Sequence, residues 1–144
     1  MTLDRQGIEQ LVPHAGAMCL LDGVARWDAS SIDCMAAAPG AAHPLLRDGA
    51  LPAVAGCEYA AQAAAVHGAL VDGAAAPRQG MLAKLMDVDF HGLRFAPADG
   101  LLAVRAGLVS RMDAGCLYEF EVGQGGRAVL SGRLIVAFPA GAPA

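Results

Sequence analysis

Small and apolar residues dominate the stretch 52–71, PAVAGCEYAAQAAAVHGALV, and this pattern predicts the central element of the chain. The composition favours one long helix, and a helix that is apolar on all sides is normally buried on all sides. Polar side chains interrupt the pattern at Glu58, Gln62 and His67. We therefore expect Glu58 to be a carboxyl group in apolar surroundings, where its ionised form is costly unless it is paired.

After this helix the pattern changes to an alternation of apolar and polar residues, which predicts strands. The expected strand segments are 82–95, 102–112, 116–122 and 128–138. In the first, Leu82, Lys84, Met86, Val88 and Phe90 form one mostly apolar face, and Gly92 is expected to mark a bulge. The expected inner face of the second strand comprises Leu102, Val104, Ala106, Leu108 and Met112. One helix followed by antiparallel strands predicts an α+β fold.

The segment before the helix is more mixed. Residues 3–11 predict a short amphipathic helix that ends before Pro13, because a residue preceding proline disfavours the helical conformation. Residues 27–37 predict a strand, and 39–49 an ordered loop that contains His43. We expect a single domain over 1–144, with a frayed tail at 139–144.

Composition restricts the function classes. A hydrophobic content of 56% predicts a compact fold whose apolar surface has a partner, and a homodimer is the simplest choice. The net charge of −4 provides no electrostatic footprint for nucleic acid. The segment 52–71 is too weakly hydrophobic to span a membrane, and the charged start of the chain is no signal peptide. We therefore expect a cytoplasmic protein.

The chain has four cysteines and no Cys-x-x-Cys spacing. Buried reduced thiols are expected, because Cys57 lies within the apolar helix and Cys34 within a predicted strand. The possible ligands do not cluster along the chain, so we expect no structural metal site.

Three segments carry a family likeness. Residues 13–24, PHAGAMCLLDGV, resemble the Pro-His-x-x-x-x-Leu-Leu-x-Asp-x-Val opening of the β-hydroxyacyl-acyl-carrier-protein dehydratases. Residues 52–62 are similar to the start of the family's helix, and 81–102 to the strand and turn that follow it. The likeness covers most of 10–138, and GCEYAAQAAAVHGAL resembles the divergent ApeP-like branch associated with aryl-polyene pigment assembly.

This resemblance implies the hotdog fold, in which an antiparallel sheet wraps around one long helix, and a dimer. It also implies dehydration of 3-hydroxyacyl thioesters on acyl carrier protein to trans-2-enoyl thioesters, in fatty-acid or polyene-type biosynthesis. No metal or dissociable cofactor is expected, because the phosphopantetheine arm belongs to the substrate.

Such a dehydration needs a base for the α-proton, an acid for the departing hydroxyl and donors for the thioester oxygen. Glu58 is the candidate acid, because desolvation keeps a carboxyl group protonated. Histidine suits the base; His14 lies in the better-matched motif, whereas His43 lies nearer the position of the family's catalytic histidine. Backbone N–H groups near Ala53 and Val54 are candidate donors.

The remaining assignments are less specific. Gln62, one turn after Glu58, is expected to orient or to support the site, and Tyr59 to line the substrate tunnel or to belong to the core. His67 and His91 are expected to be structural. Two alternative functions remain open: an acyl thioesterase of the same fold, and a non-catalytic subunit that pairs with an active dehydratase. The second is motivated by Ala53, which stands where the family has glycine, and by the loose match around His43.

Overall fold

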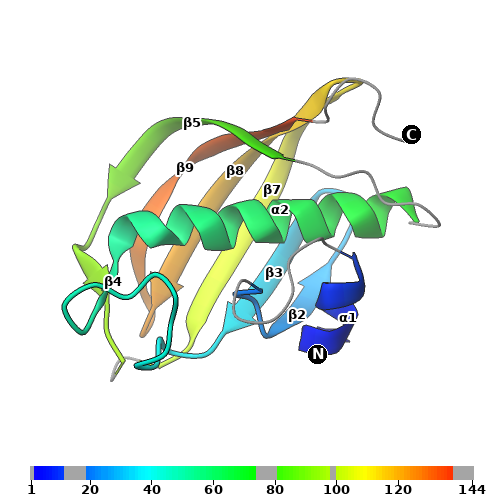
Figure 1. Cartoon of the computed structure of the whole chain (residues 1–144). Helices are drawn as coiled ribbons and strands as arrows, with labels where there is room; N and C mark the ends of the chain where they lie inside the picture. Colours follow the sequence, from blue (N-terminus) through cyan, green and yellow to red (C-terminus); the bar gives the residue numbers. More distant parts are fainter. Residues whose placement is uncertain (1, 12–18, 74–80, 98–99, 138–144) are drawn as a thin grey trace.

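A seven-stranded antiparallel sheet curves around one long helix in the computed structural model, which describes residues 2–11, 19–73, 81–97 and 100–137 (Figure 1). The strand order in the sheet is β1-β2-β3-β7-β8-β9-β5, and a separate two-stranded pair joins β4 to β6. The expected α+β hotdog architecture is confirmed.

The elements have the following bounds. The large sheet contains β1 (Leu3–Asp4), β2 (Gly23–Trp27), β3 (Ser31–Ala36), β5 (Met81–Phe90), β7 (Leu102–Met112), β8 (Gly115–Gln124) and β9 (Arg127–Ala137). The small pair contains β4 (Leu51–Pro52) and β6 (Arg94–Phe95). The helical elements are α1 (Arg5–Leu11), the 3₁₀ turn η2 (Ala53–Ala55) and α2 (Gly56–Asp72).

The long helix α2 matches the predicted element, and its two ends have clear causes. It begins where Gly56 lies so close to the sheet that an added Cβ would sit 2.3 Å from a methyl carbon of Leu130. It ends at Gly73, whose left-handed φ of 66° directs its N–H back to the carbonyl oxygen of Leu70. A glycine at each end therefore sets where the helix approaches the sheet and where it stops.

The core lies between α2 and the concave face of the sheet (Figure 1). Alanines on the buried side of α2 allow the strands to approach closely, and apolar residues of β7, β8 and β9 cover them. The buried strand residues include Leu102, Val104, Ala106, Tyr118, Phe120, Val122, Leu130, Leu134 and Val136. The prediction that Met112 belongs to this inner face is wrong: its side chain is 55% exposed, beside the turn between β7 and β8.

The first part of the sheet differs from its prediction. The segment 27–37 is not one strand, because β2 ends at Trp27 and the carboxylate of Asp28 accepts hydrogen bonds from the N–H groups of Ser30 and Ser31. These bonds form a turn that places β3 antiparallel to β2. The predicted helix at 3–11 begins at Arg5, since Leu3 and Asp4 pair with β2.

The edge strand β5 also departs from simple alternation. Its register shifts twice, between Leu82 and Lys84 and between Met86 and Asp89, where Asp87 takes a positive φ of 53°. Because of the first shift, Leu85, rather than Lys84 or Met86, pairs with the buried Leu134. The predicted alternating face of β5 is wrong at Lys84 and Met86, which lie between the two shifts, whereas Leu82 and Val88 pack against the core and Phe90 pairs with the buried Leu130.

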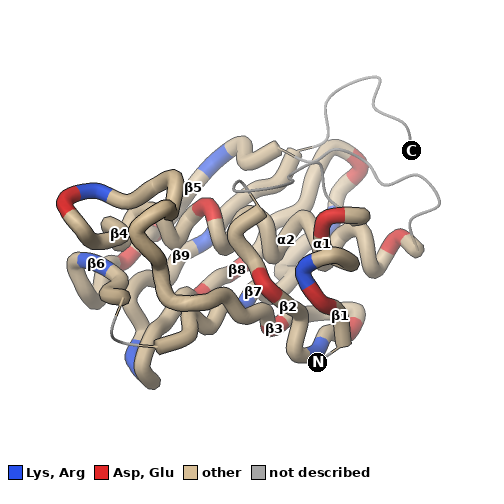
Figure 2. Tube along the Cα trace, turned by 60° about the horizontal axis from the view of Figure 1, so that its bottom comes forward, with Lys and Arg blue, Asp and Glu red and all other residues tan. Residues whose placement is uncertain are grey.

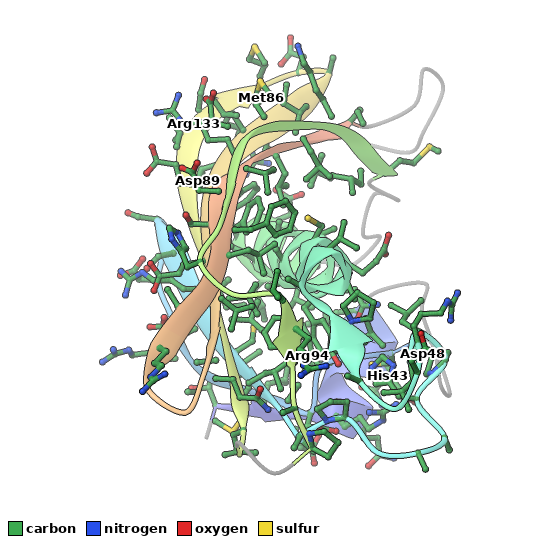
Figure 3. The ribbon with its side chains drawn as sticks, turned by 90° about the vertical axis from the view of Figure 1, so that its left-hand side faces the viewer. His43, Asp48, Met86, Asp89, Arg94 and Arg133 are labelled. Carbon is green, nitrogen blue, oxygen red and sulfur yellow. The ribbon has the colours of Figure 1, made fainter. Side chains whose placement is uncertain are left out.

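Charged residues of both signs are interspersed along the chain (Figure 2). Asp33 contacts Arg26 and Arg105 on the two neighbouring strands, and Glu119 pairs with Arg133. In Figure 3, Arg133 and Asp89 lie on the side of the sheet that faces away from α2. The sheet thus has one apolar covered face and one wetter face, as the sequence predicts.

Gln124 is a buried polar residue that the hydrophobic pattern does not reveal. Its amide nitrogen donates to the carbonyl oxygens of Ala96 and Gly100, at 2.7 and 2.9 Å, and its amide oxygen accepts from the N–H of Ala96 at 2.9 Å. One side chain at the end of β8 therefore satisfies three backbone groups on both sides of the turn before β7.

The substitution Gln124→Met should lower the free energy of unfolding by about 2 to 4 kcal/mol, because it keeps the volume but leaves buried backbone groups without partners. Urea unfolding followed by circular dichroism measures the change. Gln10→Met, at an exposed position of α1, is the matched control and should change stability by less than about 0.5 kcal/mol. Equal effects of the two variants would contradict the role of Gln124.

Candidate active site

Glu58 lies in the first turn of α2 and is exposed in this chain. The prediction that its own chain buries it is wrong. The sheet covers the side of α2 that contains Ala60, Ala63 and Ala64, whereas Glu58 lies on the opposite side. An apolar helix with one uncovered stripe is sufficient to bring the carboxyl group to the surface.

Two exposed apolar residues lie near the start of the helix that carries Glu58, together with the exposed Arg94. Val54 precedes it by one helical turn and is 58% exposed. The N–H of Ala53 donates to the carbonyl oxygen of Leu93 at 3.0 Å, so Leu93, which is 89% exposed, lies beside the same helix start. Phe90, at the end of β5, is also exposed. Exposed large apolar side chains near a helix start are candidates for contact with a partner or an acyl chain.

The same hydrogen bond bears on the predicted donors for the thioester oxygen. Because the N–H of Ala53 already donates to Leu93, it is not available to a substrate in this structure. The N–H of Val54 is left as the candidate donor at the start of the helix.

His43 lies in the loop before β4, at the same end of the molecule as Arg94 (Figure 3). Its Nδ1 accepts a hydrogen bond from the N–H of Leu45 at 3.1 Å, and its Nε2 lies 2.7 Å from the hydroxyl oxygen of Tyr59. A backbone N–H can only donate, so the neutral ring carries its proton on Nε2. Burial lowers the pKa of His43, which favours this neutral form.

Tyr59 belongs to the core, one of the two roles expected for it. Its side chain is 1% exposed, and burial raises the pKa of its hydroxyl to about 12. Its ring stacks on the imidazole of His43, with centroids 6.0 Å apart. It also lies tilted against the ring of Phe95 in β6. The phenol therefore joins the loop of His43 to α2.

Gln62 is buried, and its amide oxygen accepts a hydrogen bond from the N–H of Leu20 at 2.9 Å. It thus connects α2 to Leu20, within the motif 13–24 that also contains His14. His14 itself lies outside the described residues, so its assignment stays a prediction.

A second histidine–tyrosine pair lies near the other end of α2. His67 is fully buried, with Nε2 at 2.8 Å from the carbonyl oxygen of Asp28 and Nδ1 at 2.7 Å from the hydroxyl of Tyr118. The carbonyl oxygen can only accept, so Tyr118 donates to Nδ1. These contacts support the structural role expected for His67. His91 differs: it is exposed and bonds to Ser131.

Three further findings concern expected absences. Within residues 2–11, 19–73, 81–97 and 100–137, no group of three His, Cys, Asp or Glu residues could hold a metal ion. All four cysteines are buried thiols, as predicted. In that part of the chain no helix is long and apolar enough to cross a membrane.

Comparison with protein families decides the class. The ApeP-like model, described as ApeP dehydratase, matches residues 6–143. This chain belongs to the ApeP-like dehydratase family. It is therefore a dehydratase, and the recognition based on residues 13–102 is confirmed. A search of curated proteins finds no match.

Solved structures show the same fold. A chain of the dehydratase heterocomplex ApeI:P from Xenorhabdus doucetiae has a TM-score of 0.81 and 24% identity over 93% of this chain and 91% of that one. AziG from S. sahachiroi has a TM-score of 0.63 and 20% identity, with 82% and 90% covered. A mutant thioesterase from Pseudomonas aeruginosa has a TM-score of 0.69 and 11% identity, with 95% and 94% covered. Likeness at these identities establishes the hotdog fold alone.

The neutral His67 should make the stability of this dehydratase depend on pH. Burial lowers its pKa below the ordinary value of 6.5, so below pH 6.5 the unfolded chain binds a proton that the folded chain does not. The free energy of unfolding should fall as the pH drops below 6.5, by up to about 1.4 kcal/mol per pH unit from this group, until the folded protein also binds the proton.

Urea unfolding at pH 7.5 and pH 5.5 measures this loss. The substitution His67→Gln should lower stability at both pH values and reduce the difference between them. An unchanged difference would show that His67 is not the group responsible.

Proposed function

We propose that this dehydratase acts on 3-hydroxyacyl thioesters carried on acyl carrier protein and releases trans-2-enoyl thioesters and water. The observation that carries the residue assignment is the carboxyl group of Glu58, which lies exposed beside apolar side chains at the start of α2. The protein works in the cytoplasm and needs no cofactor, because the phosphopantetheine arm arrives with the substrate.

The reaction divides between an acid and a base. The base removes the proton α to the thioester carbonyl, the electron pair forms the new double bond, and Glu58 protonates the departing hydroxyl so that it leaves as water. Glu58 must carry a proton for this step. An apolar partner or acyl chain that covers Val54 and Leu93 would exclude water from the carboxyl group and favour its protonated form.

His14 and His43 both stay candidate bases, and the structure places one condition on His43. In His43 the one free lone pair of the neutral ring is on Nδ1, and it accepts the N–H of Leu45. His43 could remove a proton only after this bond breaks. The better match of its motif to the dehydratases favours His14, whereas the position of His43 shortly before α2 favours His43.

We also propose that the site is completed by a second hotdog subunit along β5. This strand is the edge of the sheet, and Leu85 and Phe90, which point toward the helix layer, are 38% and 55% exposed. A free edge with uncovered apolar side chains is a template for another strand. The partner is a second copy of this chain or a different subunit, and the related ApeI:P structure is a heterocomplex.

The non-catalytic alternative keeps one observation in its favour. The N–H of Ala53 is engaged, and both ring nitrogens of His43 are bonded within the chain. In that case a different subunit provides the base and the hydrogen-bond donors for the thioester oxygen. This chain then contributes only Glu58 and the apolar surface beside it. The thioesterase alternative gains no specific observation, because the likeness to thioesterases establishes only the fold.

The substitution Glu58→Gln should lower the reversible hydration of a crotonyl thioester by about 100-fold or more, because the amide cannot act as an acid. The loss of the enoyl absorbance measures the rate. Glu121→Gln, on the exposed outer face of the sheet, is the matched control and should keep the rate. An unchanged rate in Glu58→Gln would contradict the assignment, and release of free thiol without an enoyl product would favour the thioesterase.

The substitution Leu85→Lys should reduce the assembly to single subunits, because it places a charge on the apolar side of the edge strand. Light scattering after gel filtration measures the molar mass. Leu101→Lys, at a position 62% exposed just before β7, is the control and should preserve the assembly. If the wild-type chain is a monomer when purified alone, assembly with itself is excluded and a different subunit becomes the required partner.

A further inference from the structure

Two histidine–tyrosine pairs bracket α2, and they differ in the direction of their hydrogen bonds. In each pair a ring nitrogen lies 2.7 Å from a tyrosine hydroxyl. At His67 the hydroxyl of Tyr118 is the donor, because Nε2 gives its proton to the carbonyl oxygen of Asp28. At His43 the order is reversed, and Nε2 donates to Tyr59, because Nδ1 accepts from Leu45.

The hydroxyl of Tyr59 is therefore the acceptor end of a directed chain that runs from the N–H of Leu45 through the imidazole of His43. Hydrogen bonds arranged in one direction strengthen one another. The hydrogen of the Tyr59 hydroxyl remains, and within the described part of the chain no acceptor for it is found. A buried donor left in this way is uncommon, because it costs free energy unless a ligand or another group uses it.

The two rings of the pair lie close together, one of them in the core. Tyr59 is 1% exposed and packs against Phe95, while the imidazole lies nearly parallel to the phenol, with 26° between the ring planes. Burial lowers the pKa of His43. Burial, and to a smaller extent the charge of Asp22, raise the pKa of Tyr59. Two hydrogen bonds orient the imidazole: one to the hydroxyl oxygen of Tyr59 and one from the N–H of Leu45.

We propose that Tyr59 is a positioning residue of the dehydratase site: its hydroxyl oxygen accepts a hydrogen bond from the Nε2–H of His43 and fixes the imidazole beside the start of α2. This inference rests on the proposed function, because it makes the ring of His43 part of the same site as Glu58. It gives Tyr59 a role that its place in the core does not require. A phenylalanine would fill nearly the same volume but could not accept the hydrogen bond from His43.

The test is Tyr59→Phe, compared with Tyr118→Phe as the matched control. Both variants remove one oxygen atom from a fully buried tyrosine that lies 2.7 Å from an imidazole. Histidines labelled with ¹⁵N report the Nε2–H signal and the pKa of each ring by NMR, and His43→Gln assigns the His43 signals. The hydration of a crotonyl thioester reports kcat and KM.

In Tyr59→Phe the Nε2–H signal of His43 should be lost to faster exchange with water. The pKa of His43 should fall further, because the imidazolium form loses the stronger hydrogen bond. The value of kcat should fall by about 10- to 100-fold with KM unchanged. A misplaced imidazole of His43 is badly oriented toward the reacting atoms but does not weaken substrate binding. Tyr118→Phe should lower the thermal midpoint but keep kcat and the signals of His43.

A Tyr59→Phe protein with the wild-type kcat, or with an unchanged His43 signal and pKa, overturns the inference. So does an equal loss of kcat in Tyr118→Phe, since that would be a general effect of destabilisation. Absence of hydration by the wild-type protein counts against the proposed function instead, and the NMR comparison then still decides whether Tyr59 holds His43.

Discussion

The fold depends on the close packing of one small-residue helix against the concave face of a curved sheet. Alanines on one side of α2 and Gly56 at its start let the strands approach closely. The side chains of Leu130 and Phe95 therefore pack directly against the backbone of Gly56. Burial of apolar area provides most of the stability of such a layer. The sheet cannot enclose the helix completely, so a stripe that includes Glu58 remains uncovered.

This incomplete cover has a functional consequence. A single chain provides the carboxyl group, the exposed Val54 and Leu93 beside it, and a free edge at β5, but it does not provide the dry environment that a carboxylic acid needs. The water-excluding layer has to come from the acyl chain or from a second subunit. Covering the apolar surface is therefore also what would keep the carboxyl group of Glu58 protonated.

Polar groups inside the layer set the local geometry. Gln124 bonds to Ala96 and Gly100 before β7, Gln62 bonds to Leu20 within the motif 13–24, and His67 joins α2 to the turn between β2 and β3. Each provides hydrogen bonds to backbone groups that would otherwise be buried without partners. His43 and Tyr59 form a contact of the same kind, but at the end of α2 where the carboxyl group lies.

Much of this was predictable from sequence, for identifiable reasons. The run 52–71 has no strand-like alternation, and β8 alternates regularly from Tyr118 to Val122, so local pattern alone assigned them correctly. The failures have equally local causes. Asp28 formed a turn inside a predicted strand, and Asp87 introduced a bulge that a period of two cannot reveal.

The amino-acid sequence by itself determined the α+β class, the central helix and, through its motifs, the dehydratase family. It also identified Glu58 as the distinctive polar residue of the helix. Only the tertiary structure decided which side of the helix the sheet covers, that the N–H of Ala53 is engaged, and which nitrogen of His43 carries the proton. These features depend on contacts between residues distant in the chain, and neither hydrophobic period nor residue spacing contains that information.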